Sequence, residues 1–80
     1  MKAAILAFGI TKELLGDSMV ELNLPDAATV GDLKNALGKT FPALNNLASF
    51  RIAVNGHFSL PGEVIRENDE IALIPPVSGG

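Results

Sequence analysis

The chain ends in Glu70-Ile71-Ala72-Leu73-Ile74-Pro75-Pro76-Val77-Ser78-Gly79-Gly80. Residues 70–74 have the length and apolar content of a buried strand. The two prolines that follow lack backbone donors, so strand pairing must stop there and the chain must continue as an extended arm. The final two glycines have no Cβ, which lets other molecules approach the terminal backbone closely. We therefore expect one domain over residues 1–74 and a narrow, extended tail over residues 75–80.

Composition limits the number of domains, the kinds of functional site and the location of the protein. Eighty residues make one small domain, and the absence of cysteine excludes disulfides, thiolate metal sites and cysteine nucleophiles. A net charge of −3 with no tryptophan or tyrosine argues against a nucleic-acid-binding surface. The apolar run at the N-terminus ends at Thr11-Lys12, too early for a signal peptide, and no later run is long enough to span a membrane. We expect a cytoplasmic protein that does not bind membranes.

Apolar patterning predicts the strands. The run over residues 2–8 is a first strand, and the polar stretch over residues 9–18 reads as a turn region. Alternation over residues 19–24 predicts a half-buried, antiparallel second strand. Residues 51–54 form a third strand, and Asn55-Gly56 is a strong hairpin signal that leads into a short strand around residues 58–60. Residues 70–74 supply the last strand.

One helix is expected between the second and third strands. Thr29 with Asp32 has the spacing of a capping box, and Pro42 ends the helix. An apolar stripe follows at helical spacing, formed by Val30, Leu33, Leu37 and Phe41. The loop over residues 43–50 should anchor itself to the core through Leu44, Leu47 and Phe50.

A single helix can cover only one face of the sheet, which leaves the second face to be explained. Both alternating sets of the first strand are apolar, and so are both sets of the last strand. Either loops bury the central strands on both faces, or the uncovered face is an apolar docking patch. We favour the patch and assign it to Leu6, Phe8, Phe58 and Ile74.

The titratable residues do not suggest catalysis. His57 is the single histidine and has no convergent partners in the sequence, so we expect it on the hairpin surface. Glu63, Glu67, Asp69 and Glu70 are expected to form a solvated rim that steers a basic partner. We expect no metal site.

The order of elements and the tail resemble the ubiquitin-like β-grasp sulfur carriers, and most closely the small subunits of molybdopterin synthases. The matching features are Lys12-Glu13-Leu14 after the first strand, the capped helix, Ala53-Val54-Asn55, Asn68-Asp69-Glu70, and above all the ending Pro75 to Gly80. Two positions depart from the family pattern: Lys12 stands where arginine is expected and Ile74 where an aromatic residue is common. The resemblance implies an α+β fold, a mixed sheet of about four to five strands packed on one main helix, with an extended tail.

The resemblance also implies a function. An ATP-dependent, E1-like partner would adenylate the carboxylate of Gly80, and a sulfur donor would displace AMP to leave a thiocarboxylate. The tail, Pro75, Pro76, Val77, Ser78 and Gly79, would carry this group into the large subunit of the synthase, in an assembly of two small and two large subunits. The chain would have no active site of its own and no permanently bound cofactor, since ATP is used by the activating partner.

Three other functions remain open. Thiamine-pathway sulfur carriers also end in Gly-Gly, although they are usually shorter and lack the Pro-Pro pair. A ubiquitin-like protein modifier would be conjugated through Gly80 to lysines of other proteins. A β-grasp binding module would carry the tail only incidentally.

Overall fold

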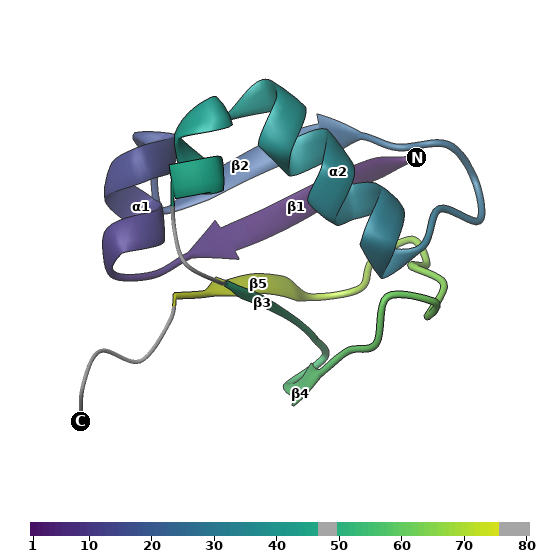
Figure 1. Ribbon diagram of the computed structural model, residues 1–80. Coiled ribbons are helices and arrows are strands. Elements are labelled where there is room, and N and C mark those ends of the chain that lie inside the picture. Colours follow the sequence, from purple (N-terminus) through teal and green to yellow (C-terminus); the bar gives the residue numbers. More distant parts are fainter. Residues whose placement is uncertain (47–49, 76–80) are drawn as a thin grey trace.

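The computed structural model describes residues 1–46 and 50–75 and shows a five-stranded sheet with one long helix packed across one face (Figure 1). The strand order is β2-β1-β5-β3-β4, in which β1 and β5 are parallel and every other neighbouring pair is antiparallel. This arrangement confirms the predicted α+β class and the mixed β-grasp sheet. The elements are β1 (Lys2–Ala7), α1 (Ile10–Leu15), β2 (Met19–Asn23), α2 (Val30–Thr40), the 3-10 helix η1 (Pro42–Asn46), β3 (Arg51–Val54), β4 (His57–Phe58) and β5 (Ile71–Ile74).

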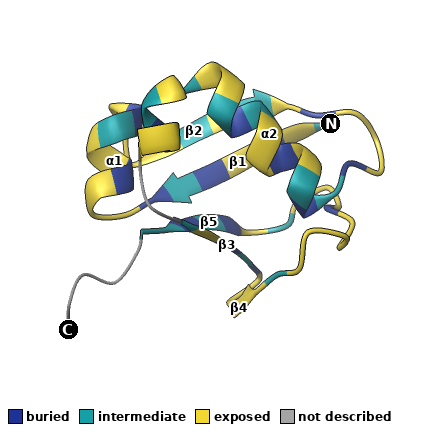
Figure 2. Ribbon diagram, viewed as in Figure 1, coloured by how far each residue is buried: buried dark blue, intermediate teal, exposed yellow. Residues whose placement is uncertain are grey.

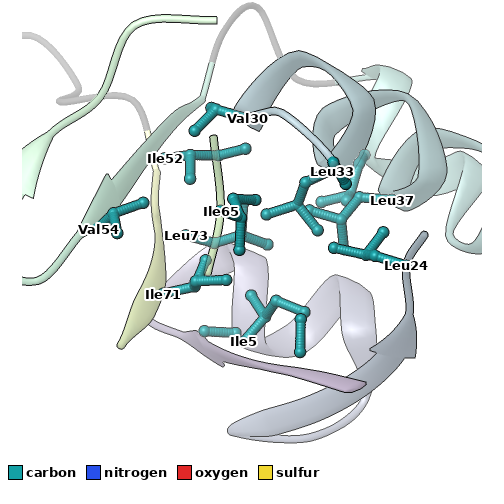
Figure 3. Close-up of a cluster of buried hydrophobic side chains, with 14 of the residues drawn as sticks. Ile5, Leu24, Val30, Leu33, Leu37, Ile52, Val54, Ile65, Ile71 and Leu73 are labelled. Carbon is teal, nitrogen blue, oxygen red and sulfur yellow. The ribbon is translucent and has the colours of Figure 1, made fainter. Parts of the chain in front are cut away.

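The core lies between α2 and one face of the sheet. In β1 the buried set is Ala3, Ile5 and Ala7, and in β5 it is Ile71 and Leu73. These strand residues meet Leu33 and Leu37 of α2, which have no exposed surface (Figure 3). Leu44 of η1 is also fully buried, as predicted, whereas Leu47 falls outside the described residues.

Helix α2 begins and ends where the sequence predicts. The Asp32 N–H donates to Thr29 Oγ1 at 3.1 Å, and the Thr29 N–H donates to Asp32 Oδ2 at 3.0 Å, which completes the capping box. At the other end, the Phe41 N–H donates to the Leu37 carbonyl at 2.8 Å, and Pro42 starts η1. No helix in the described ranges is long and apolar enough to cross a membrane.

The prediction of a turn region over residues 9–18 is wrong, because residues 10–15 form helix α1. Gly9 and Gly16, with φ of 56° and 83°, bound the helix, and the Gly16 N–H donates to the Lys12 carbonyl at 3.0 Å. A helix of six residues is far below the roughly 12 residues needed for stability in isolation. Burial of Thr11 and Leu15 against the domain therefore holds it.

The segment after β4 returns to the N-terminal end of α2 (Figure 1). There the Gly31 N–H donates to the Pro61 carbonyl and the Val30 N–H to the Glu63 carbonyl, both at 2.9 Å. A Cβ on Gly31 would lie 3.3 Å from the Pro61 oxygen, so glycine permits this close approach. These contacts satisfy N–H groups that the first turn of a helix leaves unpaired.

A polar network fixes the β3–β4 hairpin to the turn before β5. Asn55 adopts a left-handed φ of 53° at the predicted hairpin turn. Its side chain donates to Asp69 Oδ1 and accepts from the Glu70 N–H, both at 3.0 Å. The second oxygen of Asp69 accepts from the Arg66 N–H at 2.8 Å. These hydrogen bonds, first that from Arg66 and then that from Asn55, lower the pKa of Asp69 below its ordinary value.

Candidate functional site

The face of the sheet opposite α2 carries a row of apolar side chains that crosses all five strands. In the register, Leu6 of β1 lies beside Met19 of β2 and Ala72 of β5. Ala72 in turn lies beside Ala53 of β3, which lies beside Phe58 of β4. Residues paired in this way project from the same face of a sheet. We call these five residues the apolar row.

Two further apolar residues extend this face at the end of the sheet from which the tail departs. Ala7 pairs with Leu73 between the parallel strands β1 and β5. Phe8, which follows the last residue of β1, and Ile74, the last residue of β5, therefore lie at the same end of the sheet. The structure thus brings together all four residues that we predicted for partner binding. We call the apolar row with Phe8 and Ile74 the open face; its role in binding stays a prediction.

The described part of the chain does not cover the open face. Phe8, Met19 and Phe58 are 49%, 46% and 54% exposed, whereas Leu6 and Ile74 are half-buried. Figure 2 shows β4 coloured as exposed and no helix on the side of the sheet opposite α2. If loops buried both faces of the central strands, these three exposed side chains would be hidden. The described residues therefore do not support the alternative in which loops cover the second face. Exposed aromatic and methionine side chains gathered on one face are typical of a protein–protein interface.

A shallow hollow of about 450 Å³ lies within the open face. Ala53, Phe58, Ala72 and Ile74 supply its apolar walls. The guanidinium carbon of Arg51 lies 4.5 Å from the centre of the Phe58 ring, close enough for a cation–π interaction. His57 and Glu70 also line the hollow, so it can receive apolar side chains of a partner beside polar groups.

Sequence reasoning missed Met19, Ala53, Ala72 and Arg51 as members or neighbours of this face. Met19 carried a usable signal, since it shares an alternation set with Glu21 and Asn23 and is the one apolar member of that set. The two alanines gave no signal, because a small apolar residue is equally common in a core.

The base of the tail packs against the domain at the edge of the open face. Pro75 is half-buried, and a Cβ on Gly9 would lie 3.5 Å from Pro75 Cγ. The predicted tail residues Pro76, Val77, Ser78, Gly79 and Gly80 lie outside the described residues. Pro75 nevertheless fixes where the tail begins, which is next to Phe8 and Ile74.

The titratable side chains lie on the surface. His57 Nε2 is 4.0 Å from Glu63 Oε2, and both side chains are exposed. In residues 1–46 and 50–75, no group of three or more potential metal ligands comes together. What the described residues offer is an exposed apolar surface beside Pro75, where the tail begins.

Comparison with known proteins identifies the family of this chain. A family model, the ThiS family, matches residues 5–80 of the chain. The chain belongs to the ThiS family. The match includes the tail, and it confirms that this is a ubiquitin-like protein of the sulfur-carrier type.

Named relatives fall into two groups. The molybdopterin synthase sulfur carrier subunit of Dictyostelium discoideum is 38% identical, over 95% of this chain and 93% of the relative. The protein of the same name from Arabidopsis thaliana is 31% identical, over 95% of this chain and 80% of the relative. The crystal structure of SAMP1, a small archaeal modifier protein of Haloferax volcanii, is 31% identical, with a TM-score of 0.86 and full coverage of both chains.

Proposed function

We propose that this chain is the sulfur carrier subunit of a molybdopterin synthase. The observation that carries the proposal is the position of the tail, which begins at Pro75 beside the open face. A large subunit that binds Leu6, Phe8, Phe58 and Ile74 would receive the tail at a fixed point. The names of the relatives from Dictyostelium and Arabidopsis support the same assignment.

The chemistry takes place at the carboxylate of Gly80. A carboxylate is a poor electrophile, so an E1-like, ATP-dependent partner first forms the acyl adenylate and releases pyrophosphate. A donor that supplies sulfur at the oxidation level of sulfide then attacks the acyl carbon, AMP leaves, and a thiocarboxylate remains. The sulfur of this thiocarboxylate forms a bond to a pterin precursor held by the large subunit, water cleaves the acyl–sulfur bond, and the carboxylate of Gly80 is regenerated.

The partners supply the catalytic side chains and the ATP, while this chain supplies the reactive group and the means to deliver it. Two small and two large subunits would form the complete enzyme, in the cytoplasm. The activating partner and the large subunit each need the same tail in their site. Each could bind the open face and so receive the tail, which is how one small domain could serve both partners.

Reconstitution tests the proposal. The chain is thiocarboxylated, mixed with the large subunit and supplied with the pterin precursor, and molybdopterin formation is measured. We expect product from the full chain and none from a variant that lacks Gly80, although the variant folds normally. Product formation by the variant that lacks Gly80 would rule out the carrier role.

Conjugation to proteins is the second candidate. It is favoured by the likeness to the small archaeal modifier protein of Haloferax volcanii. In that case Gly80 would form isopeptide bonds with lysines. Mass spectrometry of trypsin-digested cell extracts, searched for lysines that carry residues 67–80 of this chain in isopeptide linkage, distinguishes the two functions.

A further inference from the structure

A second hollow, separate from that of the open face, lies between the first turns of α2 and the β3–β4 hairpin. We call it the edge cleft. Its volume is about 210 Å³. Val30 and Ile52 are its buried lining residues, while Phe50, Phe58 and Leu60 contribute more exposed apolar surface. Leu60 is 71% exposed, which is the highest value among the large apolar side chains of the described residues.

Two cations border the edge cleft. Lys34 Nζ lies 5.1 Å from the centre of the Phe50 ring, and Arg51 lies over the Phe58 ring. Neither cation forms a salt bridge within residues 1–46 and 50–75. No acidic residue of these ranges lines the cleft, although the chain carries nine acidic residues against six basic ones. The cleft is therefore a locally positive site on a negatively charged protein.

The N-terminus of α2 does not account for this positive site. Its first N–H groups, those of Val30 and Gly31, already donate to the carbonyls of Glu63 and Pro61. The capping box satisfies the N–H of Asp32. A negative group in the cleft must therefore be recognised by the side chains of Lys34 and Arg51.

The size of the cleft limits its occupant. Small-molecule sites usually enclose about 300–1,000 Å³, which is more than the 210 Å³ available here. A volume of this size suits one large side chain of a macromolecule. The net charge of −3 and the absence of tryptophan and tyrosine disfavour a nucleic acid.

We propose that the edge cleft binds an acidic segment of a partner protein. One large apolar side chain of that segment inserts between Phe50, Phe58 and Leu60, and neighbouring carboxylates lie beside Lys34 and Arg51. Phe58 borders both the edge cleft and the hollow of the open face, so a single partner can contact both. The inference goes beyond the proposed function, because it concerns recognition and holds whichever pathway uses the chain.

A designed peptide tests the edge cleft directly. The probe is a capped synthetic pentapeptide with a central phenylalanine and two aspartates on each side; its neutral control has asparagines in place of the aspartates. Each is titrated into the isotopically labelled full chain and followed by NMR. We expect the acidic peptide to shift the amide signals of residues 30–34 and 50–61. We expect the neutral peptide to bind about fivefold more weakly, because it loses two exposed ion pairs.

Matched variants distinguish binding in the edge cleft from nonspecific electrostatic attraction of the acidic peptide. The double variant Lys34→Gln, Arg51→Gln should bind the acidic peptide about fivefold more weakly, whereas Lys2→Gln, Lys12→Gln, which removes the same charge outside the cleft, should not. Leu60→Ser should weaken binding and Val64→Ser should leave it unchanged. All six side chains are exposed, so the variants should fold.

Three results would overturn the proposal. The first is equal affinity for the acidic and the neutral peptide. The second is a set of shifted signals centred on Leu6, Phe8 and Met19, which would place the peptide on the open face. The third is the absence of binding at millimolar peptide. None of these results would affect the carrier role of Gly80, which is tested separately by reconstitution.

Discussion

The side chain of Thr11 binds both backbone polar groups of Phe8. The Phe8 N–H donates to Thr11 Oγ1 at 3.0 Å, and the Thr11 hydroxyl donates to the Phe8 carbonyl. Thr11 is the one buried polar side chain among the described residues. It fixes the backbone that carries the exposed Phe8 ring, so helix α1 supports one corner of the open face.

Replacement of Thr11 by valine should loosen this corner. The change keeps the shape of the side chain but leaves the Phe8 N–H without its partner, while the Phe8 carbonyl keeps only the bond from the backbone N–H of residue 11. The loss should lower the free energy of unfolding by about 1–3 kcal/mol. Urea denaturation measures the loss, and hydrogen exchange should show faster exchange of the Phe8 amide. Thr40→Val, at an exposed position in α2, is the control and should change neither quantity. Unchanged stability in Thr11→Val would contradict the assigned role.

Phe8→Asp should weaken binding of the large subunit far more than it lowers stability. The ring is half exposed in the free domain, but a carboxylate there would be buried without a partner in the complex. We expect affinity to fall about 30-fold or more, as at a typical interface hot spot. Isothermal titration and thermal melts measure the two effects. Val64→Asp, equally exposed beside α2, should leave affinity unchanged, and an equal loss in both variants would argue against the open face as the interface.

Asp69 should make stability depend on pH. Its pKa is lower in the folded chain than its ordinary value of 3.8, so its contribution is fully present above that value and is lost as the pH falls through the folded pKa. Asp69→Asn should therefore destabilise the domain more at pH 7 than at about pH 2, measured by urea denaturation. Glu67→Gln, in the same turn, removes none of these hydrogen bonds and is the control for substitution in the turn. An equal loss for Asp69→Asn at both pH values would refute the expected linkage.

Gly79→Val should fold normally yet fail in activation. A branched Cβ next to the reacting carbonyl restricts the backbone and widens a tail that must enter a narrow site. A misplacement of about 1 Å can cost roughly 100-fold in rate, so adenylation by the cognate activating enzyme should slow by about that factor. Ser78→Ala is the control and should retain its rate. A wild-type rate for Gly79→Val would show that glycine is not required there.

Most of the fold could be predicted from local patterns. Alternation and turn chemistry located the strands, and the capping box located α2, because these signals depend on residues close together in sequence. Helix α1 could not be predicted in this way. It is only six residues long and lies between Gly9 and Gly16, which are typical turn residues. Its stability comes from burial of Thr11 and Leu15, which depends on residues distant in sequence.

The open face was predicted only in part for a related reason. Both alternating sets of β1 are apolar, so the sequence could not show whether Ile5 or Leu6 faces the helix. The structure resolves this, because Ile5 is fully buried and Leu6 lies in the apolar row. The edge cleft could not be foreseen, since it depends on how the segment after β4 packs against α2.

The most direct test of the carrier role is the intact mass of the chain after incubation with ATP, its activating enzyme and a sulfur donor. We predict a mass change that corresponds to one oxygen replaced by sulfur, located by fragmentation at the carboxylate of Gly80. A second sulfur carrier in the same mixture shows that the enzyme and the donor are active. An unchanged carboxylate on Gly80, while that second carrier is converted, would contradict the account.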